Sequence, residues 1–133
     1  MNIYKLRRTS KAFYKSIVSI FCPILNDTVY FTSEGYNHLL YESYDRPRNI
    51  NEQYLKLINL QYAPDVIKKA SLISETRKVK RRVKNKLKDA IHYELVYEVN
   101  LGKKIRVIVE KIGSGKPKFR SIMPHNKKSK KRS

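Results

Sequence analysis

Apolar and polar residues alternate most regularly in the last third of the chain. A period of two is typical of strands that bury one face. The alternating apolar positions are Ile91, Tyr93, Leu95, Tyr97, Val99, Ile105, Val107 and Val109. Turn residues separate these runs at 100–102 and 113–115, and a last strand is predicted over 118–123. The pattern therefore predicts an antiparallel meander.

Helical spacing dominates the first half of the chain. A helix is predicted over 10–22, because Phe13, Ile17, Ile20 and Phe21 mark one face and Pro23 ends the run. The further predicted elements are a strand over 28–32, helices over 34–44 and 50–61, and a short helix from Pro64.

Helices that precede strands define an α+β fold, with N-terminal helices packed on a curved antiparallel sheet of three to five strands. We expect a single domain over residues 1–124. Residues 125–133 carry basic residues and neither acidic nor apolar ones, so a disordered tail is predicted there.

A strongly basic segment lies between these two halves. Residues 76–88 contain eight basic residues and no acidic one, with an apolar residue at every fourth position. This pattern fits either a helix or an exposed hairpin arm. Six of its basic residues are candidates for RNA binding: Arg77, Lys78, Lys80, Arg81, Arg82 and Lys84.

The net charge indicates the class of partner. Lysine and arginine number 30 against 11 acidic residues, which gives +19, while 41% hydrophobic residues supply a core. Such a field attracts polyanions, and nucleic acid relieves it by counterion release. An anionic membrane and an acidic protein are the alternatives. The single cysteine forbids an internal disulfide, and the apolar run over 17–25 is too short to span a bilayer, so we expect a cytoplasmic location without membrane partners.

The sequence offers little for metal chemistry. Cys22, His38, His92 and His125 have no ligand spacing and no accompanying acidic pair, so neither a metal nor a cofactor is expected. Metal-free cleavage of RNA is the remaining phosphodiester chemistry. RNA supplies its own nucleophile, the 2′-OH, and the protein supplies a base, an acid and cations.

His38 is the first candidate catalytic residue, because its imidazole titrates near neutral pH and it lies on a short helix after a strand. A structural histidine near the sheet is the alternative. Arg46 and Arg48 could bind phosphate through their guanidinium forks, or could be solvated loop charges.

The strands contribute the other candidates. Tyr93 could offer a hydroxyl, although its position in the apolar alternation favours core packing. On the last strand, Lys118, Arg120 and Ser121 could contact a phosphate, but a flat strand cannot turn all three to one side.

Two short motifs carry a family resemblance. The segment Gly-Tyr-Asn-His-Leu-Leu at 35–40 follows a strand and precedes Arg46 and Arg48, and the last strand ends in Phe-Arg-Ser-Ile-Met-Pro at 119–124. In this order of elements the chain resembles the barnase/EndoU/colicin/RelE-like (BECR) ribonuclease superfamily, in its phage and toxin branches. The resemblance implies His38 as acid or base and Arg46 or Arg48 as a phosphate clamp. It implies that Lys118 or Arg120 stabilises charge together with Ser121, and that Tyr93 adds a hydroxyl or a stacking face.

The resemblance also implies a function. Its members are commonly toxins, so we expect a metal-independent endoribonuclease that acts on tRNA, mRNA or rRNA and is paired with an acidic antitoxin or immunity protein. A non-catalytic RNA- or ribosome-binding module fits the composition as well. A DNA-binding regulator fits less well, because no convincing helix-turn-helix pair is present.

Overall fold

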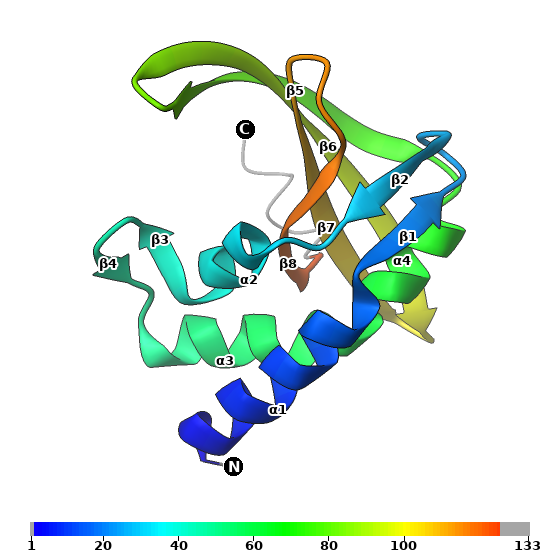
Figure 1. Cartoon of the computed structure of the whole chain (residues 1–133). Helices are drawn as coiled ribbons and strands as arrows, with labels where there is room; N and C mark the ends of the chain where they lie inside the picture. Colours follow the sequence, from blue (N-terminus) through cyan, green and yellow to red (C-terminus); the bar gives the residue numbers. More distant parts are fainter. Residues whose placement is uncertain (1, 126–133) are drawn as a thin grey trace, which may run out of the picture.

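The computed structural model describes residues 2–125 and has an α+β architecture (Figure 1). The α-helices are α1 (Ile3–Ile17), α2 (Ser33–Leu40), α3 (Ile50–Asn59) and α4 (Ala63–Lys69), with a 3-10 turn over Leu60–Tyr62. The strands of the main sheet are β1 (Ser19–Cys22), β2 (Asp27–Tyr30), β5 (Ile73–Val83), β6 (Lys86–Asn100), β7 (Lys103–Ile112) and β8 (Lys118–Pro124). Strands β3 (Tyr41–Ser43) and β4 (Arg46–Pro47) form a separate small hairpin.

The expected α+β class is confirmed, but the sheet is larger than three to five strands and is not wholly antiparallel. It has six strands in the order β1-β2-β8-β7-β6-β5, and β2 pairs with β8 in parallel. Both additional strands come from segments that the sequence left ambiguous or assigned to a helix. The predicted meander itself, β6-β7-β8, is present.

The prediction of a helix over 10–22 is wrong at both ends, because the helix begins at Ile3 and does not continue beyond Ile17. The helix ends there because Val18 adopts a positive φ of 63°, and Ser19–Cys22 then pairs with β2. Ile20 and Cys22 lie two positions apart, so they fit a strand as well as a helix, and short apolar runs do not decide between the two. In the same way, the helix predicted over 34–44 ends at Leu40, where β3 begins.

The basic segment is a hairpin arm. Strands β5 and β6 pair without a register shift from Val83↔Lys86 to Glu75↔Glu94, and the turn residues Lys84 and Asn85 both have positive φ. The tip of this arm curls over α2 in Figure 1.

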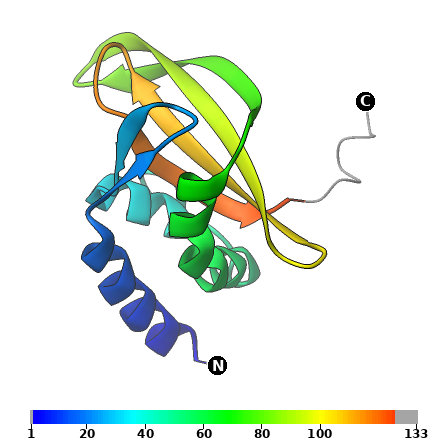
Figure 2. The same ribbon diagram turned by 90° about the vertical axis from the view of Figure 1, so that its right-hand side faces the viewer.

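The helices cover one face of the sheet, as Figure 2 shows from the side. The core lies between them and is built from Leu57, Val66, Ile105, Val107 and Phe119, among others. Neighbouring residues on a strand point to opposite faces. Arg106, Ile108 and Glu110 of β7 therefore face away from this core.

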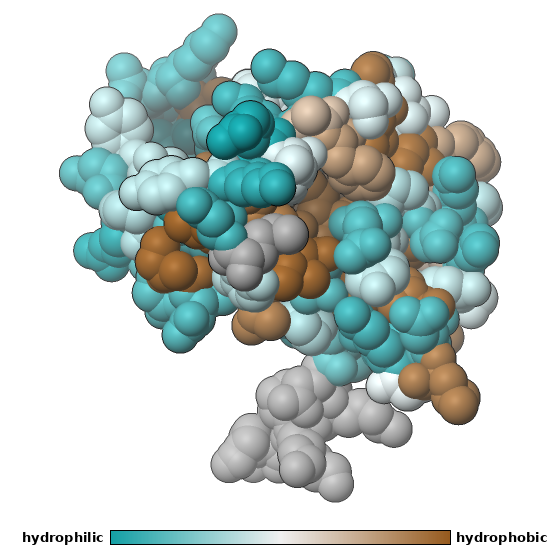
Figure 3. Space-filling view, turned by 90° about the horizontal axis from the view of Figure 1, so that it is seen from below, coloured by the Kyte–Doolittle hydropathy of each residue, from teal (hydrophilic) through white to brown (hydrophobic). Residues whose placement is uncertain are grey.

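The outer side of the helices is mixed in character. Figure 3, seen from below, shows apolar side chains among hydrophilic ones. Exposed apolar residues of α1 and α3 include Phe13, Ile50 and Leu55. No helix within residues 2–125 is long and apolar enough to cross a membrane. Apart from His125, the predicted tail lies outside the described residues.

Candidate functional site

A β-bulge in β8 brings two neighbouring polar residues to the same face of the sheet. Ile108 pairs with Ser121 and Val109 pairs with Phe119, so Arg120 is the extra residue between them. A bulge of this kind re-aims side chains that would otherwise alternate. Arg120 and Ser121 consequently line one cavity, while Phe119 and Ile122 on either side are buried in the core. A flat strand would turn Arg120 and Ser121 to opposite sides, so their shared side follows from the bulge.

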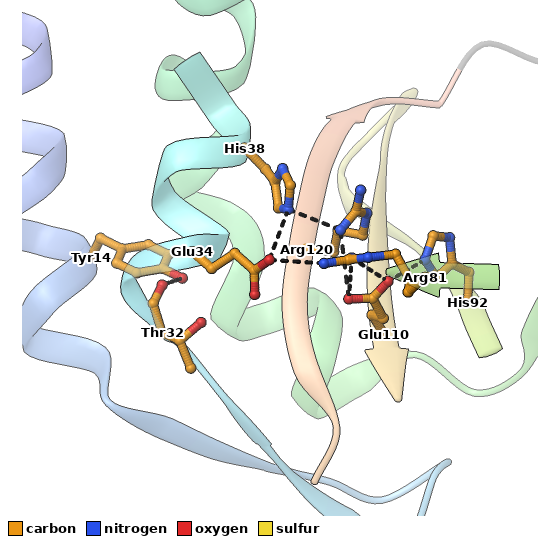
Figure 4. A network of polar contacts seen from close by, with 8 residues as sticks. All are labelled: Tyr14, Thr32, Glu34, His38, Arg81, His92, Glu110 and Arg120. Carbon is orange, nitrogen blue, oxygen red and sulfur yellow. Dashed lines mark hydrogen bonds and ion pairs between the residues drawn. The ribbon is translucent and has the colours of Figure 1, made fainter. Parts of the chain in front are cut away.

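Glu110 is the centre of a charged cluster on this face (Figure 4). The carboxylate is 3% exposed and accepts two hydrogen bonds of 2.7 Å from Arg81 Nη1. His92 Nε2 lies 2.8 Å from Glu110 Oε2, and Arg120 Nη1 lies 3.5 Å from Oε1. Arg81 extends the cluster to α2, because its Nη2 donates to Glu34 Oε2 at 2.9 Å.

The surroundings of Glu110 keep it ionised. Burial alone raises the pKa of a carboxyl, but the hydrogen bond from His92 and the charges of Arg120 and Arg81 outweigh it and lower this pKa to about 2. An ionised carboxylate only accepts hydrogen bonds. The His92 Nε2 atom is therefore the donor of their shared bond, and its proton is held by the carboxylate.

His38 reaches the same cluster from α2. Its Nε2 lies 2.9 Å from Arg120 Nη1 and 3.8 Å from Glu34 Oε2. A guanidinium has no acceptor, so Nε2 must accept and the ring is neutral in this arrangement. Burial and the charge of Arg120 lower the pKa of His38 to about 4, which keeps the ring neutral at pH 7.

Helix α2 is held firmly beside β8. Gly35 lets the helix approach closely, because a Cβ at this position would lie 2.5 Å from the Phe119 carbonyl oxygen. The Tyr14 hydroxyl donates to the carbonyl of Thr32 at 2.6 Å, at the residue that precedes the helix. At the other end, Arg48 Nε donates to the His38 carbonyl at 2.8 Å. These contacts fix the imidazole against Arg120.

The other catalytic candidates are not members of the charged cluster. Arg48 is used in the scaffold, because besides His38 it pairs with Glu52 at 3.1 Å. Arg46 is exposed on β4. Tyr93 is opposite Val109 on the core face of β6 and packs against the core. Lys118 is opposite Glu110 in the pairing of β7 with β8, so it lies on the same face as the cluster, but it does not line the cavity beside Ser121.

The basic arm divides between its two faces. Arg77 and Arg81 lie on the face that carries the cluster, where Arg77 lines the cavity and Arg81 binds Glu110. Alternation along β5 turns Lys78, Lys80 and Arg82 the other way, and all three are exposed. Lys84 is at the tip of the arm, in the turn.

A cavity of about 230 Å³ lies next to the cluster on the same face. Its polar lining includes Arg106, which binds Glu94 Oε2 at 3.1 Å. Ser121, which is part of the cavity lining, accepts a hydrogen bond of 2.9 Å from Lys56 Nζ of α3. Within residues 2–125, no three histidine, cysteine or acidic side chains lie close enough together to hold a metal ion.

Several members of this site were not predicted from the sequence: Glu34, Lys56, His92, Arg106 and Glu110. His92 was considered only as a possible metal ligand, and Glu110 was not among the candidate residues. One signal was available, since polar residues at 92, 106 and 110 occupy the non-core positions of two adjacent predicted strands.

The fold and the cluster define an α+β protein that carries two histidines and two arginines around a buried carboxylate on its sheet. We compared the chain with protein-family models, curated proteins and solved structures, and none of them matches it.

Proposed function

We propose that this protein is a metal-independent endoribonuclease that uses the 2′-OH of RNA as the nucleophile. One observation carries the proposal: neutral His38 contacts Arg120 on one side of the cluster, and His92 holds a proton against Glu110 on the other. RNA cleavage needs a base, an acid and cations between them. This cluster contains all three.

His38 is the better candidate for the base. Glu110 is too acidic to take a proton at pH 7, because its pKa is about 2. In the proposed reaction, a phosphate draws Arg120 away from His38 Nε2, which then accepts the 2′-OH proton. The 2′ oxygen attacks phosphorus, and Arg81 and Arg120 stabilise the charge that develops. The bond to the 5′ oxygen breaks as His92 donates a proton to it; in this step the ring starts doubly protonated, with Nε2–H held by Glu110, and gives up the proton on Nδ1 to become neutral. The products are a 2′,3′-cyclic phosphate and a 5′-OH end.

The biological role is proposed from the resemblance to BECR ribonucleases. It suggests a toxin that acts in the cytoplasm on tRNA, mRNA or rRNA, with an acidic antitoxin or immunity protein as partner. The charge of +19 supports both polyanionic and acidic partners. We expect expression of the chain alone to poison a host cell, and we expect His38→Ala to relieve this toxicity.

The test is incubation of purified protein with total RNA in EDTA, followed by mapping of the new ends. We expect cyclic phosphate ends, with at least about 100-fold slower cleavage after His38→Ala or His92→Ala. Arg46→Ala is the matched control, because Arg46 is exposed and lies outside the cluster. Undiminished cleavage by folded His38→Ala protein would remove this residue from the mechanism.

A non-catalytic RNA-binding module is the second candidate, and the outward face of the arm favours it. Lys78, Lys80 and Arg82 are exposed and suit a phosphate backbone without forming a catalytic centre. This function predicts salt-dependent RNA binding in EDTA with no new RNA ends, whatever the residue at position 38.

A further inference from the structure

Lys56 is an unusual residue of the α3 helix because its ammonium group is buried. The residue is 3% exposed, and Nζ contacts Ser121 Oγ at 2.9 Å and the Ile122 carbonyl at 3.3 Å. Both partners are on β8, beyond the single point at Tyr30↔Lys118 where β2 pairs with this strand. Lys56 therefore approaches the free edge of β8 directly behind the cavity.

The charge of Lys56 has no anionic partner in direct contact. Within residues 2–125, no carboxylate oxygen lies within 4.0 Å of Lys56 Nζ. The charged groups around it are Arg48, Glu52 and Arg106, and burial followed by the two arginines lowers the pKa of Lys56 to about 8 in spite of Glu52. A buried cation without a counter-charge is costly, so an anion placed nearby would be stabilised.

Ser121 connects Lys56 to the cavity. An ammonium only donates, so the contact with Lys56 occupies the oxygen of Ser121 as an acceptor and leaves the hydroxyl proton to point elsewhere. Ser121 lines the cavity together with Arg106 and Arg120. The lining also contains two carboxylates, and each is paired with an arginine of the same lining: Glu75 with Arg77 at 3.2 Å and Glu94 with Arg106 at 3.1 Å. The Nε atom of Arg106 is buried and has no hydrogen-bond partner within the described residues.

We propose that this cavity binds an RNA backbone phosphate next to the scissile one, with Ser121, Arg106 and Arg120 as its donors and Lys56 as the positioning residue. The identity of the ligand rests on the proposed function, because it assumes an RNA substrate. One water occupies about 30 Å³ in the liquid. A cavity of about 230 Å³ therefore has room for a phosphate group and its ester oxygens.

A purely structural role for Lys56, as a support for the free edge of β8, predicts different behaviour. In that case loss of Lys56 lowers stability without changing anion affinity in the molecules that remain folded. In the proposed site, the protein binds the anion more tightly when Lys56 is charged, so the anion affinity depends on the protonation of this one residue.

The first test is a titration of the whole protein with sulfate, which mimics phosphate and keeps its charge between pH 7 and pH 9. The readout is the NMR shifts of the Ser121 and Ile122 amides. Because Lys56 loses its proton near pH 8, we expect about tenfold weaker binding at pH 9 than at pH 7. Lys56→Met should weaken binding at pH 7 by a similar factor and remove most of the pH dependence. Lys69→Met is the control of equal charge, because Lys69 pairs with Asp65 on the surface of α4.

Ser121→Ala keeps the contact of Lys56 with Ile122 and covers the case in which Lys56→Met fails to fold. We expect this variant to bind sulfate at least fivefold more weakly at pH 7. Equal sulfate affinity in wild type and Ser121→Ala, or a wild-type affinity that is the same at pH 7 and pH 9, would overturn the proposal.

A dinucleotide with a 2′-deoxyribose and a terminal phosphate separates this inference from the proposed function, because it has no 2′-OH and cannot be cleaved. Binding of this probe that is weakened by Ser121→Ala supports the subsite even if the protein cleaves no RNA. RNA cleavage accompanied by probe binding that is insensitive to Ser121→Ala overturns the subsite and leaves the proposed function standing.

Discussion

Replacement of Glu110 by glutamine tests the electrostatic description of the site. The substitution keeps the shape of the side chain but removes the charge that faces Arg81, Arg120 and His92. An ordinary glutamate pKa of 4.5 falls to about 2 in the fold, and this difference corresponds to about 3 kcal/mol of stability at pH 7. Loss of one partner of a buried ion pair also costs about 3–5 kcal/mol. We therefore expect Glu110→Gln to lower the free energy of unfolding by about 3 kcal/mol at neutral pH.

The contribution of Glu110 to the free energy of unfolding should depend on pH. Because the folded pKa of Glu110 is lower than the unfolded one, its contribution is complete above pH 4.5 and is lost as the pH falls toward 2. Urea unfolding of wild type and Glu110→Gln from pH 7 down to pH 2.5 measures this directly. The two proteins should differ by about 3 kcal/mol at pH 7 and converge at the acidic end.

Glu42→Gln is the matched control for this experiment. Glu42 lies 4.0 Å from Arg46 in an exposed pair, for which a loss of less than about 1 kcal/mol is expected. A constant difference between wild type and Glu110→Gln across the pH range would refute the reasoning, since it would place the cost in packing and not in charge.

Three further predictions concern the base, the helix and the arm. If neutral His38 is the base, the acid limb of kcat/KM for RNA cleavage should appear only below about pH 4, and the residual activity of His38→Ala should lack this acid limb. Gly35→Ala should destabilise the fold by about 1–3 kcal/mol in thermal unfolding, because a Cβ would press on the Phe119 carbonyl, whereas Asn37→Ala on the exposed side of the same helix should change it by less than about 0.5 kcal/mol. Conversion of the outward-facing Lys78, Lys80 and Arg82 to glutamine should reduce the slope of log affinity for single-stranded RNA against log salt by about 2, and an unchanged slope would show that these residues do not contact phosphates.

Local patterns were sufficient to predict most elements of this fold. The period of two over β6 and β7 predicted both the strands and the face that is buried, because every second side chain on these strands points toward the helices. The error at 18–22 arose because one short run of apolar residues fits both the helical period of 3.6 and the strand period of two. The basic arm stayed ambiguous for a related reason, since its apolar positions Val79, Val83 and Leu87 also fit a helix.

The candidate site could be predicted only in part, because its contacts join distant segments. His38 and Arg120 were recognised as separate candidates, but their contact spans 82 residues of sequence. Arg81 meets Glu34 across 47 residues and Glu110 across 29. The bulge in β8 adds an irregularity that alternation does not contain, and it determines that Arg120 and Ser121 face the same cavity.

In the proposed site, the acidic residues position the arginines for a phosphate. Glu34 and Glu110 hold Arg81 through its two terminal nitrogens, so the guanidinium is fixed before any ligand arrives. The contacts of Arg120 with His38 and Glu110 both use Nη1, and no hydrogen bond to another residue within 2–125 uses its Nε or Nη2. These two donors can bind a phosphate without breaking the contact with Glu110. Glu110 therefore acts through the arginines that it orients, and this leaves the proton transfer of the proposed reaction to the two histidines.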